Sequence, residues 1–380
     1  MKIIGMMSFM YHPSSGAQQA LMRLSRQLVL RGHSVEVWFL YRKVDVDTAD
    51  LRTRFFFDGN LSLRGILVLP FRLLRAFREA QPDAVISFLP LANTLGQFCA
   101  WLASVRLRIA SHRAPAQTYS APMRIVDKLL GAMGLYTAII CVSGTVRQSF
   151  QDHPPNYRAR LHVVHNGIAW NPSSSTQLDA RRRLRLPQAG FVFVAVGRIC
   201  AQKNYSLLLE AFARTTNSYL AIAGDGEQGS EVRALARRLN LEERIFFLGH
   251  LERELVPDVL RAADAFVSSS VFEGQSNAVL EAMHEGLPIL VSDIPEQRET
   301  VVDEITGEEA GLLASLSDTA SWTIKLQRLT DDAELRRRLA LSAQKMVARR
   351  FTLDRMIDGF EQALTSAHAQ SGRHPEPHYP

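Results

Sequence analysis

The sequence of 380 residues lacks long apolar runs and has only three cysteines, and each shortage excludes a class of protein. No stretch approaches the roughly 18 consecutive apolar residues that a membrane-spanning helix needs. Cys99, Cys141 and Cys200 are widely spaced, and each stands in an apolar stretch, which argues against a disulfide framework and against a zinc site. The sequence therefore predicts a protein of a reducing compartment, soluble or peripheral to a membrane, with the cytoplasm as its expected location.

The first residues, MKIIGMMSFMYHP, combine a lysine with a short apolar run, as the start of a signal peptide does. They have no small-residue cleavage site, however, and their pattern is more typical of a first β-strand. We therefore expect no targeting segment.

Composition and charge differ between the two halves of the chain. With 47% hydrophobic residues, a chain of this length can bury substantial cores and is expected to form two domains. The formal net charge is +6, but residues 1–170 hold 20 Lys and Arg against 9 Asp and Glu, while residues 171–380 hold 24 against 29. The excess favours an anionic partner of the first half, such as phosphate groups or a lipid surface. A basic face that is merely solvated explains the same numbers.

Strand-like segments alternate with amphipathic helical segments twice along the chain, for example with a helix at 17–31. The first series of predicted strands is 2–9, 33–40, 84–89, 106–112, 138–143 and 162–167. The second series is 191–199, 218–226, 244–250, 265–270, 287–293 and 310–314. The alternation predicts an α/β protein with two doubly wound parallel sheets.

A Pro/Ser-rich break at 171–177 separates the two series, as a linker between domains does. We therefore expect one domain over 1–170 and a second over 171–350. Residues 351–380 are expected to add a helix that packs back on the first domain, followed by a disordered tail. Sheets of this kind bind ligands at the carboxyl ends of their strands, so the site is expected in a cleft between the domains.

Two carboxylates, Glu273 and Glu281, surround the start of a predicted helix in the stretch SSSVFEGQSNAVLEAMHEGLPILVSD. Backbone N–H groups at a helix start attract phosphate. Gly274 permits close backbone approach to a ligand, and Ser276 is placed to cap the helix. Because a carboxylate repels phosphate, the two acids are better suited to hold hydroxyls, and hydroxyls beside a phosphate indicate a nucleotide sugar. Alternatively, one acid is a capping residue and the other a solvated helix residue.

The stretch VGRICAQKN places Arg198 and Lys203 just after the first strand of the second series. Two cations there suit a diphosphate leaving group, because negative charge grows on phosphate oxygen as a glycosidic bond breaks. Alone they are ordinary surface cations. Together with the helix start and the two carboxylates they predict a site.

These segments resemble the family 4 glycosyltransferases (glycosyl transferases group 1), which are retaining enzymes of the GT-B fold. The spaced pair Glu273 and Glu281 is typical of that family, and Arg198 and Lys203 stand in register with it. The resemblance covers nearly the whole chain in the family's order. The similar stretches are SGAQQALMRLSRQLVLRGHSVEVW, VVHNGI, VGRICAQKNYSLLLEAFA, LAIAGDG, FLGH, FEGQSNAVLEAMHEGLPILVSD and RFTLDRMIDGFEQAL.

The resemblance implies two Rossmann-like domains facing a cleft and a role for each residue of the site. Glu273 would hold hydroxyls of the donor sugar, and Glu281 the ribose hydroxyls of the nucleotide. Arg198 and Lys203 would neutralise the diphosphate. His112, at the end of RLRIASH, would contact the donor sugar near the reaction centre. The predicted catalytic residues are His112, Arg198, Lys203 and Glu273, and the predicted donor-binding residues are Gly16, Gly197, Arg198, Lys203, Gly274, Ser276, Asn277, Ala278 and Glu281.

Three positions depart from the family pattern or have a second interpretation. Many relatives read Gly-Gly-Ala-Glu where this chain reads Ser-Gly-Ala-Gln from Ser15, so an acidic role at Gln18 is not expected. Many read Glu-Gly-Phe-Gly where this chain reads Glu-Gly-Gln-Ser-Asn from Glu273, a variant similar to members that use N-acetylhexosamine donors. His112 is alternatively a strand-end histidine whose ring is satisfied by the backbone.

The resemblance also implies a mechanism. Retention of anomeric configuration requires either a carboxylate nucleophile or attack on the face from which the diphosphate leaves. No acid in the similar stretches is an obvious nucleophile, so same-face transfer is favoured, with the departing phosphate oxygen taking the acceptor's proton. Members of the family need no metal, and the sequence has no His/Cys ligand cluster, so we expect neither a cofactor nor a metal. The expected donor substrate is a nucleotide sugar, specifically a UDP-sugar.

The segment LRGILVLPFRLLRAFREA mixes four arginines with leucines and phenylalanines, as an interfacial helix does. A sheet-flanking helix with its arginines outside gives the same pattern. Together with the basic first half, it favours a lipid-linked saccharide of cell-envelope polysaccharide biosynthesis as the acceptor. It also favours an anionic membrane surface, on the cytoplasmic side, as a partner.

Two other functions compete with this one. GDGEQG at 224–229 matches the Gly-x-Gly-x-x-Gly pattern of an NAD-dependent oxidoreductase, but the acid that should follow falls at Glu252, later than the pattern requires. A catalytically inactive binding protein of the same fold is the other alternative, against which the presence of all four charged site residues argues. Nucleic acid is not an expected partner, because the basic residues are not interleaved with exposed aromatics and no recognised nucleic-acid-binding module appears.

Overall fold

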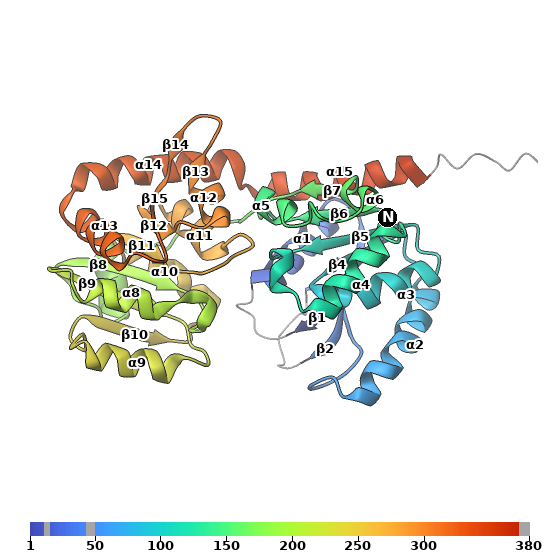
Figure 1. Cartoon of the computed structure of the whole chain (residues 1–380), viewed down its shortest axis with the longest axis horizontal. Helices are drawn as coiled ribbons and strands as arrows, with labels where there is room; N and C mark the ends of the chain where they lie inside the picture. The colour runs from blue at the N-terminus through green and yellow to red at the C-terminus, as the bar shows by residue number, and fades with distance from the viewer. Residues whose placement is uncertain (11–15, 43–49, 372–380) are drawn as a thin grey trace, which may run out of the picture. The chain divides into compact units, whose positions relative to one another are not determined.

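The computed structural model describes residues 1–10, 16–42 and 50–371, which form two compact units (Figure 1). Unit 1 comprises Met1–Gly167 and the C-terminal segment that starts at Leu353, and unit 2 comprises Ile168–Thr352. Each unit holds one parallel sheet with helices on both faces, so the predicted α/β class is confirmed. The part of the predicted disordered tail from residue 372 onward lies outside the described residues.

Unit 1 contains a seven-stranded parallel sheet in the order β3-β2-β1-β4-β5-β6-β7. The order of the chain reverses between β1 and β4, which makes the carboxyl ends of these two strands a topological switch point. Central strands of such a sheet are buried on both faces and therefore have continuous apolar sequences. The strands are β1 (Lys2–Met10), β2 (Ser34–Arg42), β3 (Arg52–Phe55), β4 (Ala84–Phe88), β5 (Leu107–His112), β6 (Ala138–Cys141) and β7 (Leu161–Val163).

Two layers of helices cover this sheet. On one face, α1 (Gly16–Leu30) and α15 (Leu353–Ser371) pack together on the sheet, so the C-terminal helix belongs to the core of unit 1. The other face is covered by α2 (Leu63–Ala80), η1 (Ala92–Gly96), α3 (Gln97–Leu102) and α4 (Ala121–Ala132). Shorter elements are η2 (Ala116–Thr118), α5 (Gly144–Gln148) and α6 (Pro155–Arg158).

Unit 2 contains a six-stranded parallel sheet in the order β10-β9-β8-β11-β12-β15, with its switch point between β8 and β11. A separate hairpin pairs β13 (Val302–Asp303) with β14 (Glu308–Glu309). The strands of the sheet are β8 (Phe191–Val196), β9 (Ser218–Ala223), β10 (Ile245–Gly249), β11 (Ala265–Ser268), β12 (Ile289–Ser292) and β15 (Gly311–Ala314).

The helices of unit 2 also form two layers. One face of the sheet packs against α7 (Gln177–Arg183), α10 (Val256–Arg261), α11 (Asn277–Glu285) and α14 (Ala333–Arg350). The other face packs against α8 (Tyr205–Phe212), α9 (Gly229–Arg238) and α13 (Thr319–Asp331). The remaining elements are η3 (Ala201–Lys203), η4 (Arg253–Leu255) and α12 (Pro295–Val301). In the part of the chain that the structure describes, no helix is both long and apolar enough to cross a membrane.

All twelve predicted strands are present, most of them shorter at the carboxyl end than predicted. The largest difference is at the strand predicted over 162–167, because the corresponding β7 already ends at Val163. The structure adds β3 at the edge of the first sheet and the hairpin of unit 2, which the sequence analysis missed. No residue of β3 is buried, so the apolar signal that marks the other strands is absent there.

Candidate active site

Two loops lie side by side at the switch point of unit 2, one after β8 and one after β11. The backbone N–H of Val271 donates to the carbonyl oxygen of Gln202 at 2.8 Å, and the Gln202 amide donates to the carbonyl oxygen of Phe272 at 2.9 Å. The Ser269 hydroxyl donates to the carbonyl oxygen of Lys203 at 2.8 Å. Because β8 and β11 are neighbours in the sheet, these bonds hold both loops in one fixed arrangement.

Lys203 and Glu273 meet where these loops join. The Lys203 Nζ donates to Glu273 Oε1 at 2.6 Å, and the two side chains are only 17% and 9% exposed. A charge-assisted bond at this depth orients both groups. The ammonium has two more hydrogens to donate, and the carboxylate has further lone pairs to accept. The pair can therefore hold an anionic oxygen and a hydroxyl at one place, and the sequence analysis predicted both residues but not their direct contact.

Gly197 and Arg198 precede Lys203 in the loop after β8. Gly197 has a φ of 153°, and a Cβ added there would lie 3.1 Å from Lys203 Cε, so glycine lets the lysine side chain lie along the backbone. The Arg198 side chain is 52% exposed, and its Nε lies 4.0 Å from Glu227 Oε2. Arg198 is thus placed in the predicted loop.

The Gly-x-Gly-x-x-Gly stretch follows β9 and packs against this same loop. A Cβ at Gly224 would lie 1.9 Å from the carbonyl oxygen of Gly197, and one at Gly226 would lie 2.3 Å from the carbonyl oxygen of Ile199. The Ile199 N–H also donates to the carbonyl oxygen of Asp225 at 3.0 Å. Close packing of two protein loops therefore explains these glycines without a dinucleotide.

The helix α11 starts directly after the loop that carries Glu273. Ser276 is its N-cap residue, as predicted, but the Ser276 side chain makes no capping hydrogen bond, so the predicted capping by its hydroxyl is wrong. Gly274 and Ser276 lie in the turn before the helix, and Asn277 and Ala278 form its first residues. The positive end of the helix dipole accordingly follows Glu273 closely in the chain.

Glu281 lies one turn further along α11 and is only 2% exposed. Its carboxylate forms an ion pair with Arg253 of η4, the short helix after β10. A buried carboxylate requires such a partner, since an unpaired charge is costly to bury. Arg253 is not among the residues predicted from the sequence, because no short-range pattern marks it as the partner of Glu281.

A further carboxyl group, Glu296 in the first turn of α12, was also missed. It is 7% exposed, and burial raises its pKa, opposed by a backbone hydrogen bond and reinforced by the charge of Glu273. The charge of Glu273 therefore acts on the carboxyl group of Glu296.

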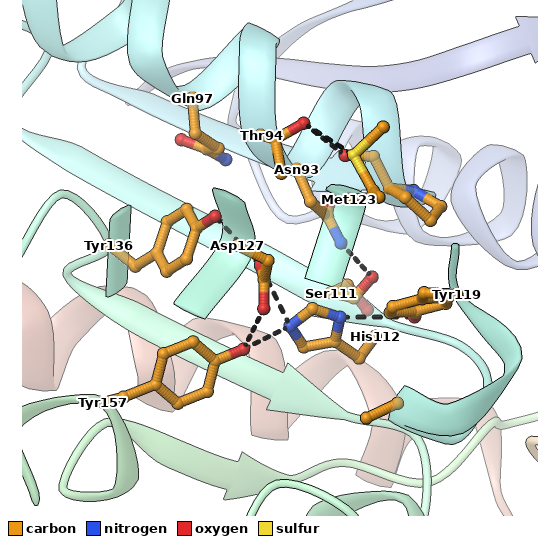
Figure 2. Close-up of polar contacts among 12 residues, drawn as sticks. Asn93, Thr94, Gln97, Ser111, His112, Tyr119, Met123, Asp127, Tyr136 and Tyr157 are labelled. Atoms are coloured by element: carbon orange, nitrogen blue, oxygen red, sulfur yellow. Dashed lines mark hydrogen bonds and ion pairs between the residues drawn. The ribbon is translucent and has the colours of Figure 1, made fainter. Parts of the chain in front are cut away.

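His112 lies in unit 1 at the end of β5 and is only 1% exposed. Figure 2 shows its ring between two tyrosines: Nε2 is 2.8 Å from the Tyr157 hydroxyl, and Nδ1 is 3.3 Å from the Tyr119 hydroxyl. Side-chain hydroxyls, rather than the backbone, thus engage both ring nitrogens. A sugar that contacts the ring through nitrogen must take the place of Tyr119, the more distant partner.

The tyrosines around Asp127 determine which nitrogen of His112 carries hydrogen. Tyr157 donates to Asp127 Oδ2 at 2.6 Å and Tyr136 donates to Oδ1 at 3.0 Å (Figure 2). Because the Tyr157 hydrogen points to the carboxylate, its oxygen must accept from the Nε2–H of His112, which leaves Nδ1 as the acceptor. Burial lowers the pKa of His112 and the Asp127 charge opposes this, so the ring is neutral at pH 7.

Arg113 follows His112 and connects it to the predicted VVHNGI stretch. Its guanidinium donates to the Asn166 amide oxygen and lies over the ring of Phe88, 5.1 Å from the ring centre. Burial lowers the pKa of Arg113 to about 9. Arg113 is not among the residues predicted from the sequence.

The remaining predicted positions are only partly described. Gly16, a predicted donor-binding residue, is the first residue of α1 and is exposed. Ser15, before it, lies outside the described residues. Among described residues, no three His, Cys, Asp or Glu side chains are grouped as metal ligands. One Asp-x-Asp pair, Asp45 and Asp47, occurs in the sequence but outside the described residues, so metal independence stays a prediction.

Two family models match the chain. The model of Glycosyltransferase Family 4 matches residues 14–169, and the model of Glycosyl transferases group 1 matches residues 176–346. The lipopolysaccharide core biosynthesis glycosyltransferase LpsE of Rhizobium meliloti is 25% identical over 364 residues, which cover 94% of this chain and 98% of the relative. The UDP-Gal:alpha-D-GlcNAc-diphosphoundecaprenol alpha-1,3-galactosyltransferase of Escherichia coli is 28% identical over 290 residues, 73% of each chain.

Solved structures show the same fold. Anabaena HepE in complex with UDP and glucose has a TM-score of 0.82 at 18% identity, covering 96% of this chain and 99% of that chain. WaaG, a glycosyltransferase involved in lipopolysaccharide biosynthesis, has a TM-score of 0.69 at 16% identity, with 96% and 99% covered. The two models, the order of their matches along the chain and these folds lead to one conclusion: the chain belongs to the family 4 glycosyltransferases (glycosyl transferases group 1) and has the GT-B fold.

Proposed function

We propose that this glycosyltransferase transfers a sugar from a UDP-sugar to a saccharide acceptor with retention of anomeric configuration. The Lys203–Glu273 pair carries the proposal, because it sets a cation for diphosphate and a carboxylate for sugar hydroxyls 2.6 Å apart at the switch point of unit 2. UDP is the favoured nucleotide because the Escherichia coli relative is named for UDP-Gal and the HepE structure contains UDP and glucose.

In this proposal, unit 2 binds the donor through several groups with separate tasks. Lys203 and Arg198 neutralise the diphosphate, together with backbone amides of Asn277 and Ala278 at the start of α11. Glu273 accepts hydrogen bonds from a hexose or N-acetylhexosamine, and Glu281 accepts them from the ribose. Arg253 holds the Glu281 carboxylate in place for that task.

The sugar is transferred on the face from which the diphosphate leaves. Glu273 and Glu281 are both ion-paired, which makes either carboxylate a poor nucleophile and supports same-face transfer over a covalent intermediate. As the glycosidic bond breaks, Lys203 stabilises the charge on the leaving phosphate, and a phosphate oxygen accepts the acceptor's proton. His112 contacts the sugar as a neutral ring and does not supply a proton.

The acceptor is a saccharide carried on a lipid in the synthesis of cell-envelope polysaccharide, at the cytoplasmic face of a membrane. The names of the relatives support this class, since they refer to the lipopolysaccharide core and to a sugar linked to diphosphoundecaprenol. The basic excess of residues 1–170 supports an anionic carrier.

Calorimetric titration of the full chain with UDP, GDP and ADP, in buffer with EDTA, tests donor binding without any acceptor. We expect UDP to bind most tightly, EDTA to leave its affinity unchanged, and Glu281→Ala to weaken binding at least about tenfold by removing ribose hydrogen bonds. Glu231→Ala, an exposed acid in the first turn of α9, is the matched control and should bind UDP as the unmodified chain does. Tighter binding of GDP or ADP would correct the nucleotide, and binding of none would contradict the site.

The stereochemistry is tested separately, by proton NMR of the first product formed from an α-linked UDP-sugar. An α-linked product is expected. A β-linked product would overturn the retaining mechanism and leave the donor site untouched.

A further inference from the structure

The outer surface of α2, α3 and α4 in unit 1 carries many exposed apolar side chains, and we call it the apolar face. These three helices cover the same face of the sheet, as Figure 1 shows beside β4 and β5. Among the residues that the structure describes, twelve of the twenty large hydrophobic side chains that are exposed belong to these helices or follow α4 directly. Its most exposed members are Leu63, Leu67, Phe71, Ile125 and Met133, and Trp101 lies on α3.

The helix α2 shows most clearly that this surface is not a by-product of core packing. Leu69, Leu73 and Phe77 point inward and are at most 1% exposed, so this side of the helix already packs against the core of unit 1. Leu63, Leu67 and Phe71 recur every four residues as a second stripe and are 83%, 72% and 75% exposed. A helix that is apolar on both sides is usually covered on both sides.

Charge on the same helices indicates what covers the apolar face. Their exposed cations are Arg64, Arg72, Arg75, Arg78, Arg124 and Lys128. Their two acids do not balance them, because Glu79 is bonded to Arg75 at 2.7 Å and Asp127 lies on the buried side of α4. Apolar side chains bordered by cations match an anionic lipid surface. A second copy of this chain is a poor match, since it would set cations against cations.

We propose that the apolar face docks on an anionic membrane surface, with Leu67, Phe71 and Trp101 in the boundary between lipid headgroups and acyl chains. The docking is peripheral, since no described helix can cross a membrane. The docking rests on the proposed function only in one respect: its purpose would be to give the enzyme access to a lipid-linked acceptor. Donor binding by unit 2 does not depend on it, so the two proposals fail independently.

Vesicle sedimentation of the full chain tests the docking. We expect binding to vesicles that contain phosphatidylglycerol and much weaker binding to phosphatidylcholine vesicles. Leu67→Ser with Phe71→Ser, and separately Arg64→Glu with Arg78→Glu, should each weaken binding to the anionic vesicles more than about tenfold, since each cation near such a surface contributes roughly fivefold.

Matched controls keep the number and kind of changes but move them to unit 2. Ile324→Ser with Leu341→Ser alters side chains that are 65% and 52% exposed, and Arg237→Glu with Arg238→Glu reverses two exposed cations of α9. Both controls should bind vesicles as the unmodified chain does. All variants should retain the melting temperature and the UDP affinity of the unmodified chain, which shows that any loss arises at the membrane.

Trp101 provides a readout at the surface itself. It is 44% exposed, whereas Trp38 and Trp322 are fully buried and Trp170, in unit 2, is only partly exposed. Brominated lipids should quench the fluorescence of the bound chain, and Trp101→Phe should remove most of that quenching. Quenching that persists in Trp101→Phe would overturn the proposed orientation.

Two other results would also overturn the proposal. One is failure of the unmodified chain to bind anionic vesicles, or equal binding by the Leu67/Phe71 variant. The other is a concentration-dependent dimer in sedimentation velocity that Leu67→Ser with Phe71→Ser abolishes, which would assign the apolar face to a second copy.

Discussion

Lys203 illustrates how one side chain serves both the stability of the site and its chemistry. In the structure its ammonium neutralises Glu273, and in the proposed reaction it also stabilises the leaving phosphate. Each partner keeps the other in position, because both are mostly buried and an unpaired charge there is unfavourable.

We expect Lys203→Ala to lower kcat about 100-fold, since it removes fixed positive charge from the leaving group while Glu281 still holds the ribose. The measurement is the steady-state rate of release of UDP from a UDP-sugar. Lys345→Ala, which alters an exposed lysine of α14, is the control and should leave the rate unchanged. An unchanged rate in Lys203→Ala would remove this residue from the site.

The pH dependence of stability is a second residue-scale prediction. An unfolded histidine has a pKa of about 6.5, and burial lowers the pKa of His112 below that value. Below about pH 6.5 the unfolded chain therefore binds a proton that the folded chain does not, so stability falls as pH decreases, by at most about 1.4 kcal/mol per pH unit for one histidine. Burial also lowers the pKa of His153, His162 and His284, so their contributions have the same sign.

We expect the melting temperature to decrease between pH 7 and pH 5.5 and to decrease less steeply in His112→Gln, which has no group to protonate. His250→Gln, at an exposed position, should follow the unmodified chain. If His112→Gln and the unmodified chain show the same slope, His112 is not a neutral buried group.

At the scale of elements, α11 is held to its neighbours by two ion pairs that resemble each other. Glu281 pairs with Arg253 of η4, and Glu285, one turn later, pairs with Arg261 of α10 at 2.8 Å. The side chains of both acids are 2% exposed, but only Glu281 is predicted to touch the donor. Substitutions in the two pairs can therefore distinguish a structural role, expected for Glu285 and Arg261, from a binding role, expected for Glu281 and Arg253.

We expect Arg253→Ala to weaken UDP binding about tenfold, because the Glu281 carboxylate loses the group that orients it. Arg261→Ala should lower the melting temperature comparably and leave UDP affinity unchanged. Titration calorimetry and thermal melts of both variants measure this. In a double-mutant cycle, Arg253→Ala and Glu281→Gln should show coupling of about 1 kcal/mol or more. Equal effects of Arg253→Ala and Arg261→Ala on UDP affinity would contradict the assignment of Glu281.

At the scale of the whole molecule, the predicted donor contacts are concentrated in unit 2, with only Gly16 and His112 in unit 1. Hydrogen exchange with and without UDP should therefore show the strongest protection in the loops at 197–204 and 269–278. The edge of the first sheet at β3, which has no predicted donor contact, is the internal control. Protection confined to unit 1 would contradict the proposed donor site.

Much of this molecule follows from local sequence alone. Period and composition locate every strand of the two sheets except β3, because a strand covered on both faces needs an uninterrupted apolar run. The edge strand β3 and the ends of strands were missed, since partly exposed residues carry no such signal. The charged residues after β8 and β11 were recognisable because helix starts and phosphate chemistry impose local requirements.

Tertiary structure decided which of these residues touch. The contact of Lys203 with Glu273 depends on β8 and β11 being neighbours, although 70 positions separate the two residues. Glu281 is paired with Arg253, and His112 is hydrogen-bonded to Tyr157. Each of these partners comes from another element, and no short-range sequence pattern marks it. The apolar face likewise depends on three helices lying on one side of a sheet. Local sequence determined the elements and the kind of chemistry, while long-range packing determined the pairing of charges, since only folding brings distant side chains within bonding distance.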